Sequence, residues 1–440
     1  MASPRAQRRL VVLTYHFPLD GSVGGLRWAG LTKYLSTLGW TSTVVTAAPP
    51  HQGPETSGAT TISLSRRRTA TDLYRWLARA EARDQSAGAG MPSAVARRDG
   101  LWKRSRREVD TLLWFPDESR GWIMRSARRL RRTIRATDPD VVVSSGPPHG
   151  AHLAAWLATR GLDVAWFADL RDPWAFLVWP GHRQVDSRLA SAAARWCERL
   201  VATRCTGMIA NTPELVEALT ARYPQTKVFR IPNGVDRELL PRPDATPFPG
   251  FALAHVGSLY GRRDITPVLR AVGALCTHRV EARAGGCTLH LVGDIDRPQR
   301  ELLGRVAEDL TLAGAVKLYG AVPRTEALGV LARSHVAVIA AQGQDMMIPA
   351  KLYEAVAVAR AVLVLAPRTS ATGLEAARLG ARVVDPDDAD GLARQVEDLW
   401  THRHEPAGLE SAGVGYDAVA YRVDEVLRAA GAARDSRRRQ

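Results

Sequence analysis

The sequence LVVLTYHFPLDGSVGGLRWAGLTKYLSTLGWTSTVVT, residues 10–46, is the clearest indication of the fold class. It begins with an aliphatic run at residues 10–14, which predicts a buried strand. A loop with three glycines follows, and residues 26–38 then carry apolar side chains at helical spacing up to Gly39, a typical helix stop. Residues 43–46 predict the next strand. A strand, a glycine loop, a helix and a second strand in this order are typical of the opening of a doubly wound α/β domain.

The same alternation continues along the chain and restarts once, after the Pro-rich residues 241–249. We therefore expect an α/β protein with two Rossmann-like, doubly wound domains that face each other across a cleft, because open parallel sheets bind ligands beyond the carboxyl ends of their strands. The expected boundaries are residues 1–234, with a basic insertion at about 52–135; residues 250–412; and residues 413–440, a C-terminal helix that returns toward the first domain and ends in a disordered tail after Arg434.

The composition excludes several classes of protein. The chain has 440 residues, of which 45% are hydrophobic and 24% charged, as in ordinary globular proteins and unlike collagen, coiled coils or disordered chains. No apolar run reaches the length of about 18 residues that a transmembrane helix needs, and the apolar stretch near the N-terminus is too short for a signal peptide. Four dispersed cysteines without a CxxC motif predict a reducing, cytoplasmic location and no zinc site; they are Cys197, Cys205, Cys276 and Cys287.

Positive charge is concentrated in one stretch. The formal net charge is +15, and residues 66–135 hold 19 basic and 8 acidic side chains. Residues 120–135 predict a helix with a narrow apolar stripe between arginines. Such a helix can lie among lipid headgroups, so we expect peripheral contact with an anionic membrane or a lipid-linked acceptor; alternatively, the stripe faces the domain core. The arginines are Arg125, Arg128, Arg129, Arg131, Arg132 and Arg135, and the stripe is Ile123, Met124, Leu130 and Ile134.

Ten segments, in order, resemble the GT-B-fold glycosyltransferases of family 4, the retaining group also called glycosyl transferases group 1. The resemblance extends over nearly the whole chain. It implies a first domain that binds the acceptor and a second that binds a nucleotide sugar. The segments are VGGLRWAGLTKYLSTLGW, FPDESRGW, SSGPPHGAH, FADLRDPW, NTPELVEAL with IPNGVD, HVGSLYGRRD, LVGD, VKLYGAVPRTEAL and IPAKLYEAVAVARAVL.

The resemblance implies donor-binding residues in three places. The first place is the glycine loop at residues 21–25, which in the family lies near the donor diphosphate. Its glycines let backbone amides approach a phosphate near a helix N-terminus, although they also suit a plain tight turn. In HVGSLYGRRD two arginines offer fixed charge to a leaving diphosphate. In IPAKLYEAVAVARAVL, Glu354 corresponds to the second acid of an E-x7-E pattern and would accept bonds from ribose hydroxyls; Met346 stands where the first acid belongs, with Asp345 beside it. The expected donor residues are Gly24, Gly25, Gly257, Ser258, Arg262, Arg263, Lys351 and Glu354.

Catalytic and acceptor-binding residues are expected at two strand ends of the first domain. FADLRDPW places three ionisable residues beside Trp174, where an Asp can align a hydroxyl and an Arg can pair with an anion; the alternative is an Arg–Asp pair that braces the loop. SSGPPHGAH places His149 on a strand–helix loop that faces the same cleft. The expected catalytic residues are Asp172, His149 and Arg171, and the expected acceptor-binding residues are Asp169 and Trp174.

These features predict an enzyme, a glycosyltransferase that moves a sugar from a nucleoside diphosphate sugar to a hydroxyl acceptor. Catalysis in such enzymes depends on positioning and charge stabilisation more than on a strong protein base. No cofactor or metal is expected, because no DxD-like pair stands in a suitable loop. Three alternatives remain open: a nucleotide-sugar epimerase of the same architecture, a nucleic-acid-binding protein that uses the Arg-rich block, and an inactive homologue that lacks the acid at Met346.

Overall fold

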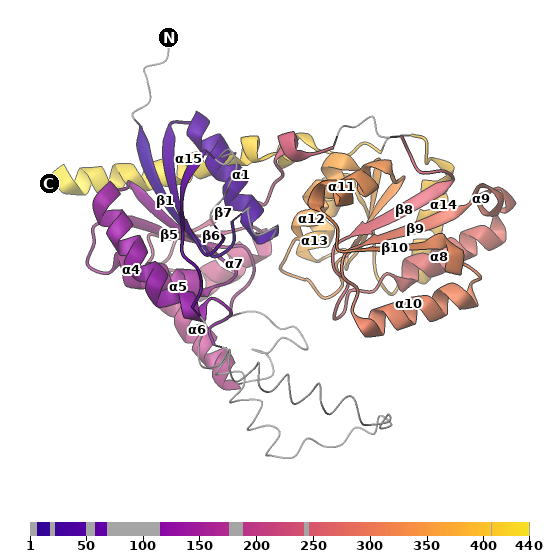
Figure 1. Ribbon diagram of the computed structural model, residues 1–440, viewed down its shortest axis with the longest axis horizontal. Helices are drawn as coiled ribbons and strands as arrows, with labels where there is room; N and C mark the ends of the chain where they lie inside the picture. Colours follow the sequence, from indigo (N-terminus) through magenta and orange to yellow (C-terminus); the bar gives the residue numbers. More distant parts are fainter. Residues whose placement is uncertain are drawn as a thin grey trace, which may run out of the picture. The chain divides into compact units, whose positions relative to one another are not determined.

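The computed structural model describes residues 7–17, 23–49, 58–67, 115–175, 188–241, 246–405 and 407–439 (Figure 1). The chain divides into two compact units. Unit 1 comprises Met1–Ala210, Ala218–Phe229 and Asp424–Gln440, and unit 2 comprises Asn211–Glu217 and Arg230–Val423. Each unit has its own sheet, so the expected two doubly wound α/β domains are confirmed.

Unit 1 contains a seven-stranded sheet in the order β3-β2-β1-β4-β5-β6-β7. The central strands β4 and β5 are buried at every residue, as in parallel sheets covered by helices on both faces. The strands are β1 (Arg8–Thr14), β2 (Trp40–Thr46), β3 (Ala59–Ser63), β4 (Val141–Gly146), β5 (Ala165–Leu170), β6 (Gly207–Ala210) and β7 (Val228–Arg230). The helices described are α1 (Val23–Thr37), α4 (Arg120–Thr137), α5 (Gly150–Thr159), α6 (Arg188–Ala202) and α7 (Pro213–Arg222), which begins in unit 2.

Unit 2 contains a six-stranded parallel sheet in the order β10-β9-β8-β11-β12-β13. Its strands are β8 (Phe251–Val256), β9 (Cys287–Val292), β10 (Val316–Gly320), β11 (Val336–Ala340), β12 (Ala361–Leu365) and β13 (Arg382–Val384). Its helices are α8 (Thr266–His278), α9 (Val280–Gly285), α10 (Arg297–Asp309), α11 (Arg324–Arg333), α12 (Ala350–Val358), α13 (Ala371–Arg378) and α14 (Ala389–Thr401), with short 3₁₀ turns at Arg237–Leu239, Ala313–Ala315 and Ala412–Val414.

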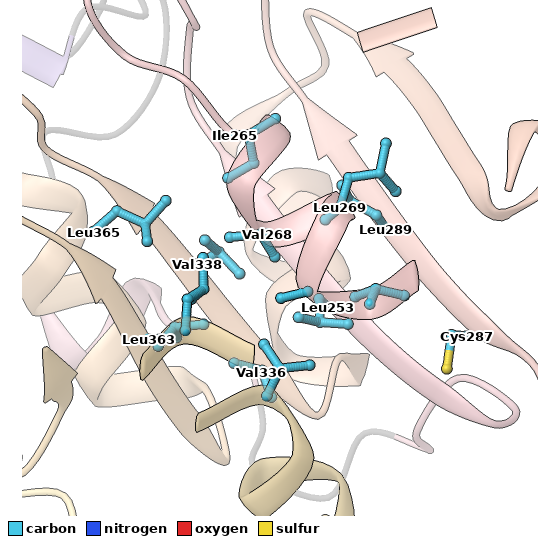
Figure 2. Packing of buried hydrophobic residues seen from close by; sticks show 14 of the residues in the cluster. Leu253, Ile265, Val268, Leu269, Cys287, Leu289, Val336, Val338, Leu363 and Leu365 are labelled. Carbon is cyan, nitrogen blue, oxygen red and sulfur yellow. The ribbon is translucent and has the colours of Figure 1, made fainter. Parts of the chain in front are cut away.

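Alternate residues of the unit 2 strands face opposite sides of the sheet. Leu253, Val338 and Leu363 belong to the cluster that packs against α8 through Val268 and Leu269 (Figure 2). Their strand neighbours belong to a second cluster with α11 and α12; these are Ala254, Ala337, Ile339, Val362 and Val364. Two hydrophobic cores on the two faces hold the strands in register and so fix the positions of the strand ends.

The C-terminal helix α15 (Tyr416–Arg439) joins the two units in sequence, since its residues from Asp424 belong to unit 1. Trp40 Nε1 donates to Asp424 at 2.6 Å, and Arg428 donates to the carbonyl of Leu38 at 2.6 Å. The backbone stays helical beyond Arg434, where the sequence predicts a disordered tail. No helix among the described residues is long and apolar enough to cross a membrane.

Candidate functional site

The strand order of unit 2 reverses between β8 and β11. From β8 the chain builds β9 and β10 on one side, then returns to place β11 on the other. The β8–β11 ladder stops at the pair Ala254–Ala337, before either strand ends. Ligands of open α/β sheets bind beyond the carboxyl ends of the strands at such a reversal. The loops after β8 and β11 are therefore the candidate donor site of unit 2.

Lys351, in the first turn of α12, reaches the end of β8. Its Nζ lies 3.4 Å from Nε2 of His255, a fully buried residue of β8. Gly257 follows β8 with a φ of 123°, and a Cβ at this position would lie 2.6 Å from the same Nζ. Burial, together with the charge of Arg263, lowers the pKa of Lys351 to about 7. The amine is therefore held close to the backbone, next to another cation.

Arg263 is fixed by three neighbours. Its guanidinium lies over the Tyr260 ring at 4.5 Å and donates to the carbonyl of Ser258 at 3.4 Å. With its amide oxygen assigned toward the guanidinium, buried Gln344 accepts from Arg263 Nη2 at 2.6 Å and from Nε at 2.8 Å. Arg262 beside it is exposed. The loop after β11 thus holds one arginine of HVGSLYGRRD in place.

Glu354 lies one turn along α12 from Lys351 and is 8% exposed. Its partner is Arg324 at the start of α11, whose Nε and Nη2 both donate to Oε1, at 2.9 and 2.7 Å. In the described part of the chain we find no donor to the other carboxylate oxygen, Oε2. Lys351 and Glu354 stand three residues apart on α12, a spacing that would also suit an exposed Lys–Glu pair. Glu354 pairs with Arg324 instead, and one oxygen of Glu354 is left for a ligand.

The loop before α12 is tied down through its backbone. The carbonyl of Asp345 accepts from the amide of Ala371 at 2.8 Å, and the carbonyl of Met346 accepts from Thr212 Oγ1 at 3.0 Å. The carbonyl of Met347 accepts from Thr372 Oγ1 at 2.6 Å. The Asp345 carboxylate is exposed and lies beside the position of the missing acid. Because Met346 supplies no carboxylate and the loop is held in place, the groups that can contact a ligand here are the backbone and the nearby cations.

In unit 1 the corresponding reversal lies between β1 and β4. Asp169, next to it at the end of β5, is fully buried and accepts four hydrogen bonds. Arg27 donates twice, from Nε at 3.2 Å and Nη2 at 3.1 Å, while Trp28 Nε1 and Ser145 Oγ each donate at 2.8 Å. The carboxylate thus joins α1, β4 and β5. An Arg–Asp brace exists here, but its arginine is Arg27 from α1 and not Arg171 from the same loop.

Arg171 also joins the loops at this reversal. Its Nε donates to the carbonyl of Gly146 at 3.0 Å, and its two terminal nitrogens donate to the carbonyls of Gly24 and Pro147. The sequence predicts that Gly24 and Gly25 lie in a loop before the helix. This prediction is wrong: both lie inside the first turn of α1. Gly21 lies outside the described residues. The guanidinium thus attaches the start of α1 to the loop after β4.

His149 and Trp174 pack on each other. Their rings stack with centroids 5.0 Å apart and planes 10° apart, and Trp174 is 1% exposed. His152 lies beneath them, bonded through Nδ1 to Ser144 Oγ at 2.9 Å, and burial lowers its pKa to about 3. Asp172, partly exposed, lies in the same loop as Trp174. The structure therefore gathers the predicted acceptor-side residues, while their catalytic and acceptor-binding roles stay predictions.

The basic helix α4 uses its apolar stripe for packing. Leu130 and Ile134 are 0% and 5% exposed, and α4 packs against α5. Arg125 donates to the carbonyl of Ser65, and Arg131 to those of Ala158 and Arg160. The exposed arginines are Arg128, Arg129, Arg132 and Arg135. Leu130 and Ile134 thus face the domain core, the alternative that the sequence left open, whereas Met124 of the same stripe is 54% exposed beside the outer arginines. Most of the basic insertion, residues 68–114, lies outside the described residues.

Four residues of these sites were not predicted from the sequence: His255, Gln344, Arg324 and Arg27. Each lies in a different element from its partner. Arg27 and Asp169 are 142 positions apart, and no local spacing joins them. A histidine inside an aliphatic strand was the one available signal, because a buried imidazole needs a hydrogen-bond partner.

Comparison with protein families assigns both halves of the chain. Residues 25–239 match the model of Glycosyltransferase Family 4, and residues 250–402 match that of Glycosyl transferases group 1. The two matches follow each other in the order of the two sheets.

Comparison with solved structures shows the fold. Sucrose-phosphate synthase from Thermosynechococcus elongatus matches with a TM-score of 0.62 and 14% identity, over 97% of this chain and 100% of that chain. Alr3699/HepE from Anabaena, in complex with UDP, matches with a TM-score of 0.60 and 14% identity, over 96% of this chain and 100% of that chain. A protein assigned as a UDP-N-acetylglucosamine 2-epimerase from Listeria monocytogenes matches with 0.56 and 13%, over 96% of each. No curated protein sequence matches the chain.

Proposed function

Because the chain belongs to the glycosyltransferases, with a Family 4 domain followed by a group 1 domain in one GT-B fold, we propose that it moves a sugar from a nucleoside diphosphate sugar to a hydroxyl acceptor with retention of configuration. The donor binds to unit 2 at the β8–β11 reversal. The HepE structures contain UDP and UDP-glucose, which supports a nucleotide sugar as the donor here.

One observation carries this proposal: Lys351, in the first turn of α12, reaches the end of β8 with its Nζ 3.4 Å from His255 Nε2, where burial and then the charge of Arg263 lower its pKa. Bringing two cations together in a partly buried place costs free energy unless an anion binds between them. The N-terminus of α12 adds its own partial positive charge. A diphosphate matches this arrangement in charge, and its charge increases as the sugar leaves.

The acceptor reacts on the face of the sugar from which the diphosphate leaves, and the leaving phosphate takes the acceptor proton. The protein then contributes position and positive charge. Asp172, His149 and the loop that Arg171 holds are our candidates for orienting the acceptor. A peripheral contact of unit 1 with an anionic, lipid-linked acceptor would use the exposed arginines of α4.

A screen of nucleotide sugars by thermal shift tests the donor, and a product assay tests the reaction. Transfer requires a second substrate, whereas an epimerase converts its nucleotide sugar alone. The Listeria monocytogenes protein that is assigned as an epimerase has the same fold, so the fold does not distinguish the two reactions. The anomeric configuration of the product, read by NMR, tests retention. A product that forms without any acceptor and keeps its nucleotide would contradict the proposal.

Glu354→Ala is expected to weaken donor binding by about 1–3 kcal/mol, as for the loss of a hydrogen bond to a charged group. Titration calorimetry with the nucleotide sugar measures the change. Glu326→Ala, which removes an exposed carboxylate from the first turn of α11, is the control and should leave binding unchanged. Full donor affinity in Glu354→Ala would show that this carboxylate does not contact the donor.

Turnover is expected to need no divalent metal, because Lys351 and Arg263 can carry the charge of the leaving diphosphate. Initial rates measured with excess EDTA should equal those measured with magnesium or manganese. A rate that disappears with chelator and returns with either ion would overturn this expectation.

A further inference from the structure

His255 is a buried group of unit 2 that the sequence did not assign to any role. It lies in β8 at the point where the ladder to β11 has ended, and its side chain spans the gap between the two strands. Its Nδ1 lies 2.9 Å from the carbonyl oxygen of Val338 in β11. A carbonyl only accepts, so we assign the ring proton to Nδ1. This leaves Nε2 as an acceptor, directed at Lys351 Nζ at 3.4 Å.

The space around Lys351 Nζ is restricted on the backbone side. The missing side chain of Gly257 leaves room for the amine, since a Cβ there would approach Nζ to 2.6 Å. A positive φ of 123° makes any other residue at this position strained as well. The strand end and the imidazole therefore determine where the amine lies.

The charged groups that face this amine come from every neighbouring element. Arg263 lies in the loop after β8, and Glu354 lies one turn along α12, where Arg324 of α11 already pairs with it. Burial and Arg263 lower the pKa of Lys351 to about 7, and Glu354 opposes this shift. Burial and Lys351 hold the pKa of His255 well below its ordinary value, so the imidazole stays neutral. The pKa of the Lys351 amine therefore lies near neutral pH.

We propose that His255 is a positioning residue of the donor site: the carbonyl of Val338 locks its ring, its Nε2 holds Lys351 at the end of β8, and binding of a diphosphate draws a proton from solvent onto the Lys351 amine. The inference rests on the proposed donor site. In this step the neutral Lys351 amine takes one proton from solvent, and the resulting ammonium contacts the bound diphosphate. Of the three N–H groups of the ammonium, one faces His255 and two are available to phosphate oxygens.

The proposal predicts that donor affinity depends on pH with a definite sign. A group whose pKa rises on binding takes up a proton wherever it is neutral in the free protein, above about pH 7 here. Donor affinity should therefore be constant below about pH 6.5 and fall up to about tenfold per pH unit above pH 7.5. Each phosphate of a nucleotide sugar carries one ester and one anhydride bond and keeps only one, strongly acidic, ionisable oxygen, so the diphosphate does not titrate in this range.

Calorimetry on the full chain with UDP-glucose, ADP-glucose and GDP-mannose tests the proposal. Titrations in buffers of different ionisation enthalpy give the number of protons taken up. We expect a larger proton uptake at pH 7.5 than at pH 6, because a larger fraction of the Lys351 amine is neutral in the free protein at the higher pH. Lys351→Met should take up none at either pH. Binding by the wild type without proton uptake would overturn the inference and leave the donor site standing, whereas no binding of any of the three would contradict the donor site itself.

His255→Phe separates positioning from a merely structural role. It keeps a ring but removes the acceptor, so Lys351 becomes harder to protonate. Affinity should fall about tenfold more at pH 7.5 than at pH 6. His255→Gln, which offers an amide oxygen, should recover part of that difference and serves as the test if His255→Phe does not fold. Equal losses at the two pH values in these variants would show that His255 only supports the fold and would overturn its positioning role.

Discussion

Asp169→Ala is expected to destabilise unit 1 by about 3–5 kcal/mol. The carboxylate accepts four hydrogen bonds, two of them from the guanidinium of Arg27, which is 3% exposed, and its removal takes both bonds away from that buried charge. Breaking one partner of a buried pair costs this much because the remaining charge has lost its contact with water. Hydrogen exchange at the amides of β4 and β5, measured by mass spectrometry, follows unit 1 separately from unit 2.

Asp140→Ala is the matched control for Asp169→Ala. Asp140 also pairs with an arginine of unit 1, Arg8, at 3.0 Å, but both side chains are about one-fifth exposed. Its loss should cost about 1 kcal/mol, as for a partly solvated pair. Equal effects of the two substitutions would contradict the role of Asp169 as the buried centre that joins α1, β4 and β5.

Lys351→Met is expected to weaken donor binding about 100-fold, which corresponds to about 2.7 kcal/mol. Methionine keeps most of the length of the side chain but supplies no charge and no donor to a phosphate. The loss should appear with every nucleotide sugar that binds, because the diphosphate is common to all of them. Equilibrium dissociation constants at pH 6.5, where Lys351 is mostly protonated, give the cleanest comparison.

Lys317→Met in β10 is the control, since it removes an exposed lysine of the same unit. It should leave donor affinity within about twofold. Equal weakening by both substitutions would mean that the net charge of unit 2, and not the position of Lys351, determines donor affinity.

Aliphatic periodicity predicted most of the fold, because strands of a parallel sheet are buried on both faces and show as short apolar runs. The edge strand β3 was missed for the opposite reason. Three of the five residues of its sequence ATTIS are polar and only the first residue is buried, so it lacks the apolar run of an inner strand. The glycines at the start of α1 were placed in a loop because glycine usually ends a helix, whereas here two of them lie in its first turn.

The donor residues named from the sequence were brought together by topology. Gly257, Ser258 and Arg263 follow β8, while Lys351 and Glu354 follow β11, so both groups reach the same end of adjacent strands. The partners of these residues could not be predicted. Whether Glu354 pairs with Lys351 or with Arg324 depends on how α11 packs against α12, and sequence spacing does not determine that packing.

We expect a nucleoside diphosphate sugar to bind to unit 2 at the first turn of α12. A crystal structure of the full chain with the nucleotide sugar that binds most tightly in the screen tests it most directly. Diphosphate density is expected within hydrogen-bonding distance of Lys351 Nζ and the Arg263 guanidinium, with Glu354 Oε2 near a ribose hydroxyl. Density for the nucleotide in the pocket of unit 1 lined by Arg195, Arg199 and Arg222, with none at α12, would contradict it.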